Sequence, residues 1–198
     1  MPYVNKAERE INCKIVYYGP GMCGKTTNLL YIHSAIKAKH KNELITLSTE
    51  GERTIFFDFL PLETTIIQGF TTRFQLYTIP GQVFYNATRR IILQGCDGLV
   101  FVADSAWDKQ KENVESFNNL KENLATYNQL LRDIPYVVQY NKRDLPKVAM
   151  RPYMEFLLNN EEPKVPSFDA VATTGQGVFD TLNAICSLVL KRLLEQYG

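Results

Sequence analysis

A chain of 198 residues with a net charge of +1 lacks the basic excess that nucleic-acid-binding and membrane-surface domains usually carry. Hydrophobic residues make up 45% of it and charged residues 22%, the balance of a globular protein, so we expect a single domain over residues 1–198. No apolar run approaches the roughly 20 residues that a membrane-spanning helix needs. We therefore expect no nucleic-acid partner and no integral membrane segment.

The cysteines and the chain ends bear on the cellular compartment. The four cysteines lie at least ten residues apart, which excludes a C-x-x-C metal or redox pair. Because we find neither a signal peptide nor a lipidation motif, we expect a cytoplasmic protein that reaches membranes only through partners. The sequence leaves the oligomeric state open, and a monomer is the simplest expectation.

Apolar runs of strand length alternate with segments of helical period, the pattern of a mostly parallel sheet covered by helices on both faces. The predicted strands are residues 11–17, 43–49, 72–79, 98–103, 136–140 and 168–172. The predicted helices are residues 25–38, 83–93, 114–131, 152–158 and 178–193. The fold class is therefore α/β, with a sheet of six or seven strands.

Two of these strands have distinctive patterns. Residues 98–103 are continuously apolar, which predicts a central strand buried on both faces. Residues 72–79 alternate apolar with more polar side chains, which predicts a more exposed strand, antiparallel to a neighbour.

The strongest local signal joins the first strand to the first helix. Residues 19–26, Gly-Pro-Gly-Met-Cys-Gly-Lys-Thr, match the phosphate-binding pattern G-x-x-x-x-G-K-[ST] in its required strand-loop-helix setting. Glycines let backbone N–H groups curl around a phosphate, and Lys25 reaches the β- and γ-phosphates while Thr26 offers a hydroxyl to Mg²⁺. The predicted nucleotide contacts are Gly19, Gly21, Met22, Cys23, Gly24, Lys25, Thr26 and Thr27.

A second motif, Asn141-Lys142-Arg143-Asp144, follows the predicted strand 136–140, at the edge where open α/β sheets bind ligands. The Asp144 carboxylate can accept hydrogen bonds from N1 and the 2-amino group of guanine. Adenine has no 2-amino group and no proton on N1, so it would leave this charge unpaired and be rejected. We therefore expect GTP or GDP, with Mg²⁺, as the ligand.

The two motifs, at this separation and in this strand order, resemble those of Ras-like small GTPases over nearly the whole chain. A narrower resemblance is to the MglA family of bacterial gliding-motility and cell-polarity GTPases. It rests on residues 11–20 (INCKIVYYGP), 53–61 (RTIFFDFLP), 77–85 (YTIPGQVFY) and 139–146 (QYNKRDLP). The family implies a P-loop small-GTPase fold and slow GTP hydrolysis. It also implies polarity and motility effectors, recruitment to a cell pole and a dimeric roadblock-type activating protein.

The same resemblance assigns catalytic roles beyond Lys25. Thr54 becomes the switch threonine that senses Mg²⁺ and the γ-phosphate. Gly81 joins the expected nucleotide contacts, and Gln82, which follows it, becomes the residue that orients the attacking water, a task that suits a carboxamide. Arg53 becomes an arginine finger that the chain supplies itself, whereas sequence alone would favour a solvated loop arginine.

One position departs from the broad Ras-like pattern. Thr78 stands where an aspartate normally opens D-x-x-G, although MglA-type proteins share the threonine, so the outer support of Mg²⁺ stays open, with Asp58 and Asp104 as candidates. By resemblance, Ala172 and Thr173 belong to the loop that backs the guanine base through a backbone N–H.

The sequence also leaves open what nucleotide binding at this site is used for. Residues 55–57, 59–61 and Phe70 form an apolar cluster around the expected switch, which suits either core packing or a nucleotide-dependent partner surface. A regulated GTPase switch is the first hypothesis, and a scaffold that binds GTP with negligible hydrolysis is the second. A P-loop ATPase or kinase is a third, against which Asp144 argues.

Overall fold

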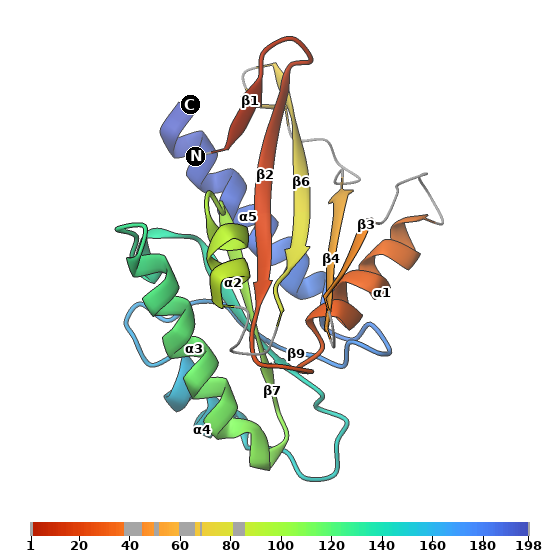
Figure 1. Cartoon of the computed structure of the whole chain (residues 1–198), viewed down its shortest axis with the longest axis vertical. Helices are drawn as coiled ribbons and strands as arrows, with labels where there is room; N and C mark the ends of the chain where they lie inside the picture. The colour runs from red at the N-terminus through yellow and green to blue at the C-terminus, as the bar shows by residue number, and fades with distance from the viewer. Residues whose placement is uncertain are drawn as a thin grey trace.

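The structure is a computed structural model that describes residues 2–37, 45–49, 52–59, 66–67, 69–80 and 86–197 (Figure 1). The strands in these ranges are β1 (Tyr3–Asn5), β2 (Glu10–Tyr18), β3 (Ile45–Thr49), β4 (Glu52–Phe59), β5 (Ile66–Ile67), β6 (Phe70–Thr78), β7 (Gly98–Asp104), β8 (Tyr136–Asn141) and β9 (Ser167–Asp169). The helices are α1 (Lys25–Lys37), α2 (Asn86–Leu93), α3 (Gln110–Ala125), α4 (Arg151–Leu158) and α5 (Val178–Tyr197). Two short 3-10 turns, η2 (Trp107–Lys109) and η3 (Leu131–Asp133), flank α3.

The strands form one sheet, whose main path runs β3-β4-β6-β2-β7-β8-β9, with β1 added to β2 and β5 added to β6. From β6 to β9 every pairing along this path is parallel, whereas β4 pairs antiparallel with both β3 and β6. The register sets Tyr17 beside Thr78 and Asp104 beside Asn141, so the parallel strands end at one edge. The predicted α/β fold with a mostly parallel sheet is confirmed.

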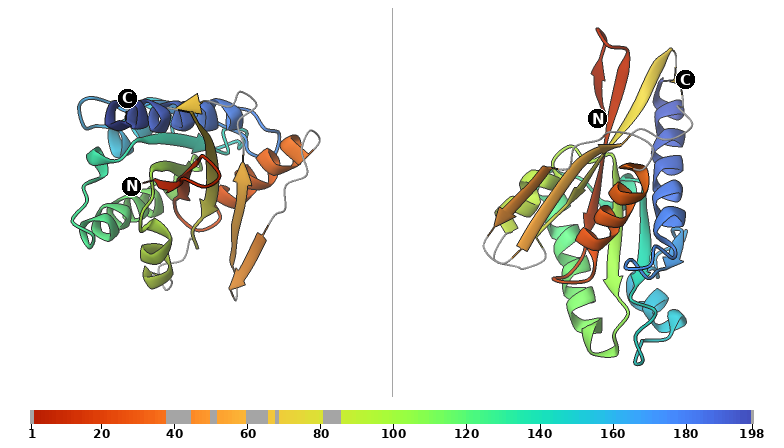
Figure 2. Two further views of the ribbon diagram at one scale, coloured as in Figure 1. Left: turned by 90° about the horizontal axis from the view of Figure 1, so that it is seen from above. Right: turned by 90° about the vertical axis from the view of Figure 1, so that its right-hand side faces the viewer.

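Two hydrophobic clusters attach helices to the two faces of the sheet (Figure 2). Leu29 of α1 and Leu182 of α5 belong to the cluster on one face. Leu93 of α2, Phe117 of α3 and Met154 of α4 belong to the cluster on the other. The helices therefore cover both faces, as the alternation of strand and helix patterns predicts.

The strand β7 lies between β2 and β8 and is buried along its whole length. Because strand side chains alternate between faces, Val100 and Val102 join the cluster of α1 and α5, and Phe101 and Ala103 join the other. The prediction of a central strand at residues 98–103 is confirmed. β6 has the alternating burial predicted for it and is antiparallel to β4, although its other neighbour, β2, is parallel.

The sequence pattern does not predict β1, β4 or β5. β4 is the most consequential omission, because it separates β3 from β6 and covers residues 52–59, which sequence reasoning treats as switch and loop. Its pairing sets Phe56 beside Tyr77, a partner distant in sequence that local periodicity does not reveal. The side chains of β4 lie outside the described part of the structure, so the packing of the apolar cluster there stays open.

Several element boundaries differ from prediction, and two of these differences have a clear structural reason. α3 spans residues 110–125 instead of 114–131, because the chain turns after Ala125 and Asn128 adopts a left-handed backbone conformation with φ of 55°. β9 ends at Asp169 instead of residue 172, since the N–H of Ala172 donates to the side chain of Asn141 and not to a neighbouring strand. Among the described helices, none combines the length and the apolarity needed to cross a membrane.

Candidate functional site

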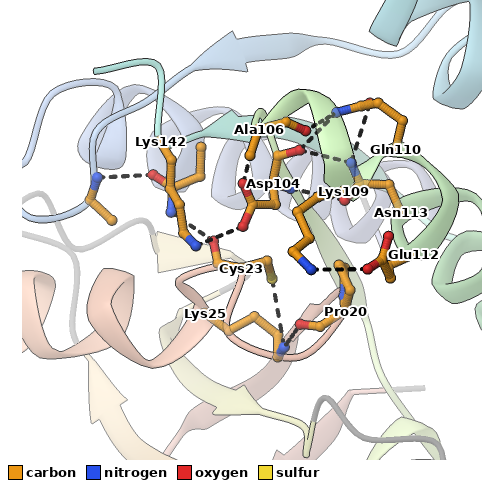
Figure 3. Close-up of polar contacts among 12 residues, drawn as sticks. Pro20, Cys23, Lys25, Asp104, Ala106, Lys109, Gln110, Glu112, Asn113 and Lys142 are labelled. Atoms are coloured by element: carbon orange, nitrogen blue, oxygen red, sulfur yellow. Dashed lines mark hydrogen bonds and ion pairs between the residues drawn. The ribbon is translucent and has the colours of Figure 1, made fainter. Parts of the chain in front are cut away.

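The predicted phosphate loop and the predicted base-recognition loop lie at the same edge of the sheet (Figure 3). β2 ends immediately before Gly19, while β7 ends at Asp104 and β8 at Asn141. Because β2, β7, β8 and β9 are successive parallel strands, their carboxyl ends place the loops that follow β2, β8 and β9 at the same edge. The third of these, residues 170–177, follows β9.

Lys25 opens α1 with its ammonium group turned back into the phosphate loop. Its Nζ donates to the carbonyl oxygens of Gly19 at 2.9 Å and Pro20 at 2.6 Å, and the residue is 5% exposed (Figure 3). Carbonyl dipoles alone leave a net positive charge at this buried position, which favours an anion nearby. Burial raises the pKa of the neighbouring Cys23 thiol even though Lys25 opposes the shift, so this thiol stays neutral and leaves the positive charge in place.

Two glycines of the loop have positive φ angles and no room for a side chain. Gly19 has φ of 149°, and a Cβ built there would lie 2.1 Å from the carbonyl oxygen of Val102. Gly24 has φ of 101°, and its Cβ would lie 2.1 Å from Nδ2 of Asn141. The loop is therefore packed closely against the ends of β7 and β8.

Asn141 joins all three loops through one buried side chain. Its Nδ2 donates to the carbonyl oxygen of Cys23 at 2.8 Å, and its Oδ1 accepts from the N–H of Ala172 at 2.9 Å. The residue is 2% exposed, so both bonds are protected from water. This amide therefore sets the separation between the first motif and the second.

Lys142 adopts a positive φ of 65° and turns toward β7. Its Nζ lies 2.6 Å from Oδ2 of Asp104, whose other oxygen accepts from the N–H of Ala106 at 3.0 Å. Asn113 of α3 bonds both backbone groups of Asp104, at 2.9 Å and 2.8 Å, which fixes the end of β7 (Figure 3). Both carboxylate oxygens are thus already engaged, one by Lys142 and the other by Ala106, which argues against Asp104 as a support for Mg²⁺.

Asp144 is exposed at the tip of the second loop. The loop is anchored by Arg143, whose N–H donates to the carbonyl of Ala170 at 3.1 Å and whose Nη1 donates to the carbonyl of Ala149 at 2.7 Å. In the third loop, Ala172 is buried and Thr173 is exposed. The bond from Arg143 to Ala170 therefore ties the second loop, next to the exposed acid, to the start of the third loop.

The switch residues are placed only in part. Thr78 is fully buried at the end of β6, beside Tyr17 of β2, and thus lies at the phosphate edge of the sheet. Arg53 and Thr54 belong to β4 and not to a loop, paired with Ser48 and Leu47 of β3. The side chains of these two residues and of Asp58, together with the whole of Gly81 and Gln82, fall outside the described part of the chain.

Sequence reasoning missed the partnership of Asp104 with Lys142. One signal could have revealed it. Asp104 is an acid at the carboxyl end of an apolar central strand, and Lys142 directly follows the neighbouring parallel strand, so the two residues leave the sheet at the same edge. The predicted P-loop, N-K-x-D and third-loop residues do come together at this edge, although their individual roles toward a nucleotide are proposals taken up below.

A search of known proteins decides the family. The chain is 57% identical over 193 residues to the mutual gliding-motility protein MglA of Myxococcus xanthus, covering 98% of each chain. The chain belongs to the MglA family of small GTPases. No model in a scan of protein families matches it. The motifs on which the MglA resemblance rests are thus part of a likeness that extends over almost the entire chain.

Proposed function

We propose that this chain is a molecular switch that binds GTP or GDP with Mg²⁺ and slowly hydrolyses GTP to GDP. The observation that carries the proposal is the buried amide of Asn141, which bonds Cys23 of the phosphate loop and Ala172 of the third loop. It brings residues 19–26, which we propose as the cradle for a phosphate chain, to the same edge of the sheet as the exposed acid Asp144. A guanine nucleotide has both a phosphate chain and the donor pair that suits such an acid.

The phosphate end of the site suits a nucleotide that brings its own metal ion. Among the described residues, no three His, Cys, Asp or Glu side chains converge to hold a cation. Mg²⁺ is commonly held by phosphate oxygens, water and one or two protein oxygens, so the hydroxyls of Thr26 and Thr54 would suffice. When bound, Mg²⁺ neutralises charge on the β- and γ-phosphates. Lys25 would do the same from the other side, and backbone N–H groups of residues 19–27 would fix the phosphate position.

Arg53 and Gln82 are our candidates for the hydrolytic step. The register of β4 on β6 sets Phe56 beside Tyr77, so the residues before Phe56 run past the carboxyl end of β6, toward the edge where the phosphate loop lies. Arg53 from this direction would add positive charge at the γ-phosphate, and Gln82 would orient the attacking water. Thr54, next to Arg53, would report whether the γ-phosphate is present.

We further propose that the GTP state recruits cell-polarity and motility partners and that a dimeric roadblock-type protein accelerates hydrolysis. The support is the 57% identity to a protein named for gliding motility. Recruitment to a cell pole would then depend on these partners.

Calorimetry and single-turnover hydrolysis test the proposal. We expect the wild-type chain to bind GDP and GTP but not ATP, and Asp144→Ala to lose this preference. We expect Arg53→Ala and Gln82→Leu each to slow hydrolysis by about a hundredfold while nucleotide affinity is kept. Arg132→Ala, an exposed arginine in η3, is the control. Binding of ATP as tight as GTP would contradict the proposal, and unchanged hydrolysis in both variants would favour the scaffold alternative.

A further inference from the structure

α2 and α3 pack against each other on one face of the sheet (Figure 1). Polar side chains are buried between these helices and the end of β2. Asn123 of α3 is fully buried, and its Nδ2 donates to the hydroxyl of Tyr18 at 3.0 Å and to Oδ1 of Asn86 at 2.8 Å. Its Oδ1 accepts from Nε of Arg90 at 3.0 Å. Buried amides joined in this way hold one arrangement of the elements that supply them, because an unmade bond is costly.

The carbonyl oxygen of Asn119 is the centre of this cluster. Oδ1 accepts from the hydroxyl of Tyr18 at 2.7 Å and from Nη1 of Arg89 at 2.7 Å. Burial raises the pKa of Tyr18, so its hydroxyl keeps the proton that it donates. Arg89 also lies over the ring of Tyr18, with Cζ 5.5 Å from the ring centre. One oxygen of α3 thus holds a residue of β2 and a residue of α2 together.

Both of these residues adjoin the phosphate edge. Tyr18 is the last residue of β2 and directly precedes Gly19. Arg89 is 1% exposed and donates from Nε to the carbonyl oxygen of Pro80 at 2.9 Å, just past the end of β6. In the sequence Pro80 is followed by Gly81 and Gln82. The path from Asn119 through Arg89 to Pro80 therefore sets how the chain leaves β6 relative to the start of the phosphate loop.

We propose that Asn119 is a positioning residue for GTP hydrolysis, whose amide oxygen holds Arg89, and through it Pro80, against the strand that leads into the phosphate loop. This inference rests on the proposed GTPase function. Asn119 touches no nucleotide in this scheme, so nucleotide affinity is unaffected. Its loss removes the acceptor that it offers to Nη1 of Arg89, and the segment after β6 is held less firmly when the water must be oriented.

The test compares three variants of the full chain by single-turnover hydrolysis and by GDP and GTP affinity. Asn119→Leu deletes the acceptor, Asn119→Asp keeps it and adds charge opposite Arg89, and Asn118→Leu changes the exposed neighbour. We expect the first to slow hydrolysis by about tenfold, with affinity within about twofold of wild type. The aspartate variant and the Asn118 variant should hydrolyse GTP at the wild-type rate. Asn119→Ala makes the same deletion if the leucine variant does not fold.

Hydrogen exchange of the α2 amides, residues 86–93, in the nucleotide-free protein gives a readout that needs no GTPase activity. Exchange should be faster in Asn119→Leu than in wild type and unchanged in Asn119→Asp. Unaltered hydrolysis in Asn119→Leu would overturn the inference, as would an aspartate variant as slow as the leucine one. If the wild-type chain does not hydrolyse GTP, the proposed function fails, and with it the hydrolytic role of Asn119. The hydrogen-exchange measurement would still show whether Oδ1 of Asn119 stabilises α2.

Discussion

The ammonium Nζ of Lys142 lies 2.6 Å from Oδ2 of Asp104, a residue that is 3% exposed at the end of β7. The lysine belongs to the N-K-x-D motif and has a positive φ, and its side chain, which is 34% exposed, reaches across to this acid. The pair thus connects the proposed base-recognition loop to the central strand of the sheet.

We predict that Asp104→Asn weakens the hold on nucleotide at this loop. Asparagine keeps an acceptor for the N–H of Ala106 but loses the charge that holds Lys142, so GDP should dissociate faster by about fivefold to tenfold. Stopped-flow displacement of a fluorescent GDP measures the rate. Asp108→Asn, an exposed acid in η2, is the matched control. Equal dissociation rates in Asp104→Asn and wild type would show that the ion pair has no such role.

Removing the side chain that joins the three loops should destabilise the whole protein. Asn141→Ala takes this partner from the carbonyl of Cys23 and from the N–H of Ala172, which should lower the free energy of unfolding by about 3 kcal/mol. Urea denaturation of the nucleotide-free protein provides the measurement. Asn160→Ala, at an exposed position after α4, should change it little. A loss in Asn141→Ala no larger than in this control would contradict the bridging role.

Alanine substitutions at two glycines should distinguish the cost of backbone strain from the cost of a steric clash. Gly95 has φ of 71° and open space where a Cβ would stand, so Gly95→Ala should cost about 1 kcal/mol through strain alone. Gly19→Ala adds contact with the carbonyl of Val102 and should cost about 4 kcal/mol or prevent folding. Thermal unfolding without nucleotide distinguishes these costs from ligand effects. A similar loss of stability in the two variants would mean that the backbone at Val102 moves to accommodate the new methyl group at little cost.

The buried thiol of Cys186 predicts a pH dependence of stability. Burial raises its pKa from 9.0 to about 12. The unfolded chain therefore loses this proton first, and stability declines as the pH rises from about 9 toward 12, by up to about 1.4 kcal/mol per pH unit for this group. Cys186→Ala should remove that part of the slope, measured by urea denaturation between pH 8 and pH 10.5. An identical slope in wild type and variant would show that the thiol titrates normally.

Local pattern predicted the parts of the fold whose signal lies within one element. The continuous apolar run at residues 98–103 is typical of a strand covered on both faces, and β7 is such a strand. β4 escaped prediction because its pairing of Phe56 with Tyr77 joins residues that are distant in the sequence, which local periodicity does not reveal. The amides of Asn119 and Asn123 escaped it too, since polar residues on an amphipathic helix are ordinarily assigned to solvent.

By itself the sequence determined which chemistry is available. The spacing of residues 19–26 and the order Asn141 to Asp144 predict a phosphate cradle and an acid suited to guanine, because both motifs depend on residue type over a few positions. Only the tertiary structure decided which polar groups share a site. Parallel strands ending at one edge put Asp104 beside Lys142. The packing of α2 on α3 enclosed Arg89 with Asn119, because burial forces polar groups to find partners, even ones that are far away in the chain.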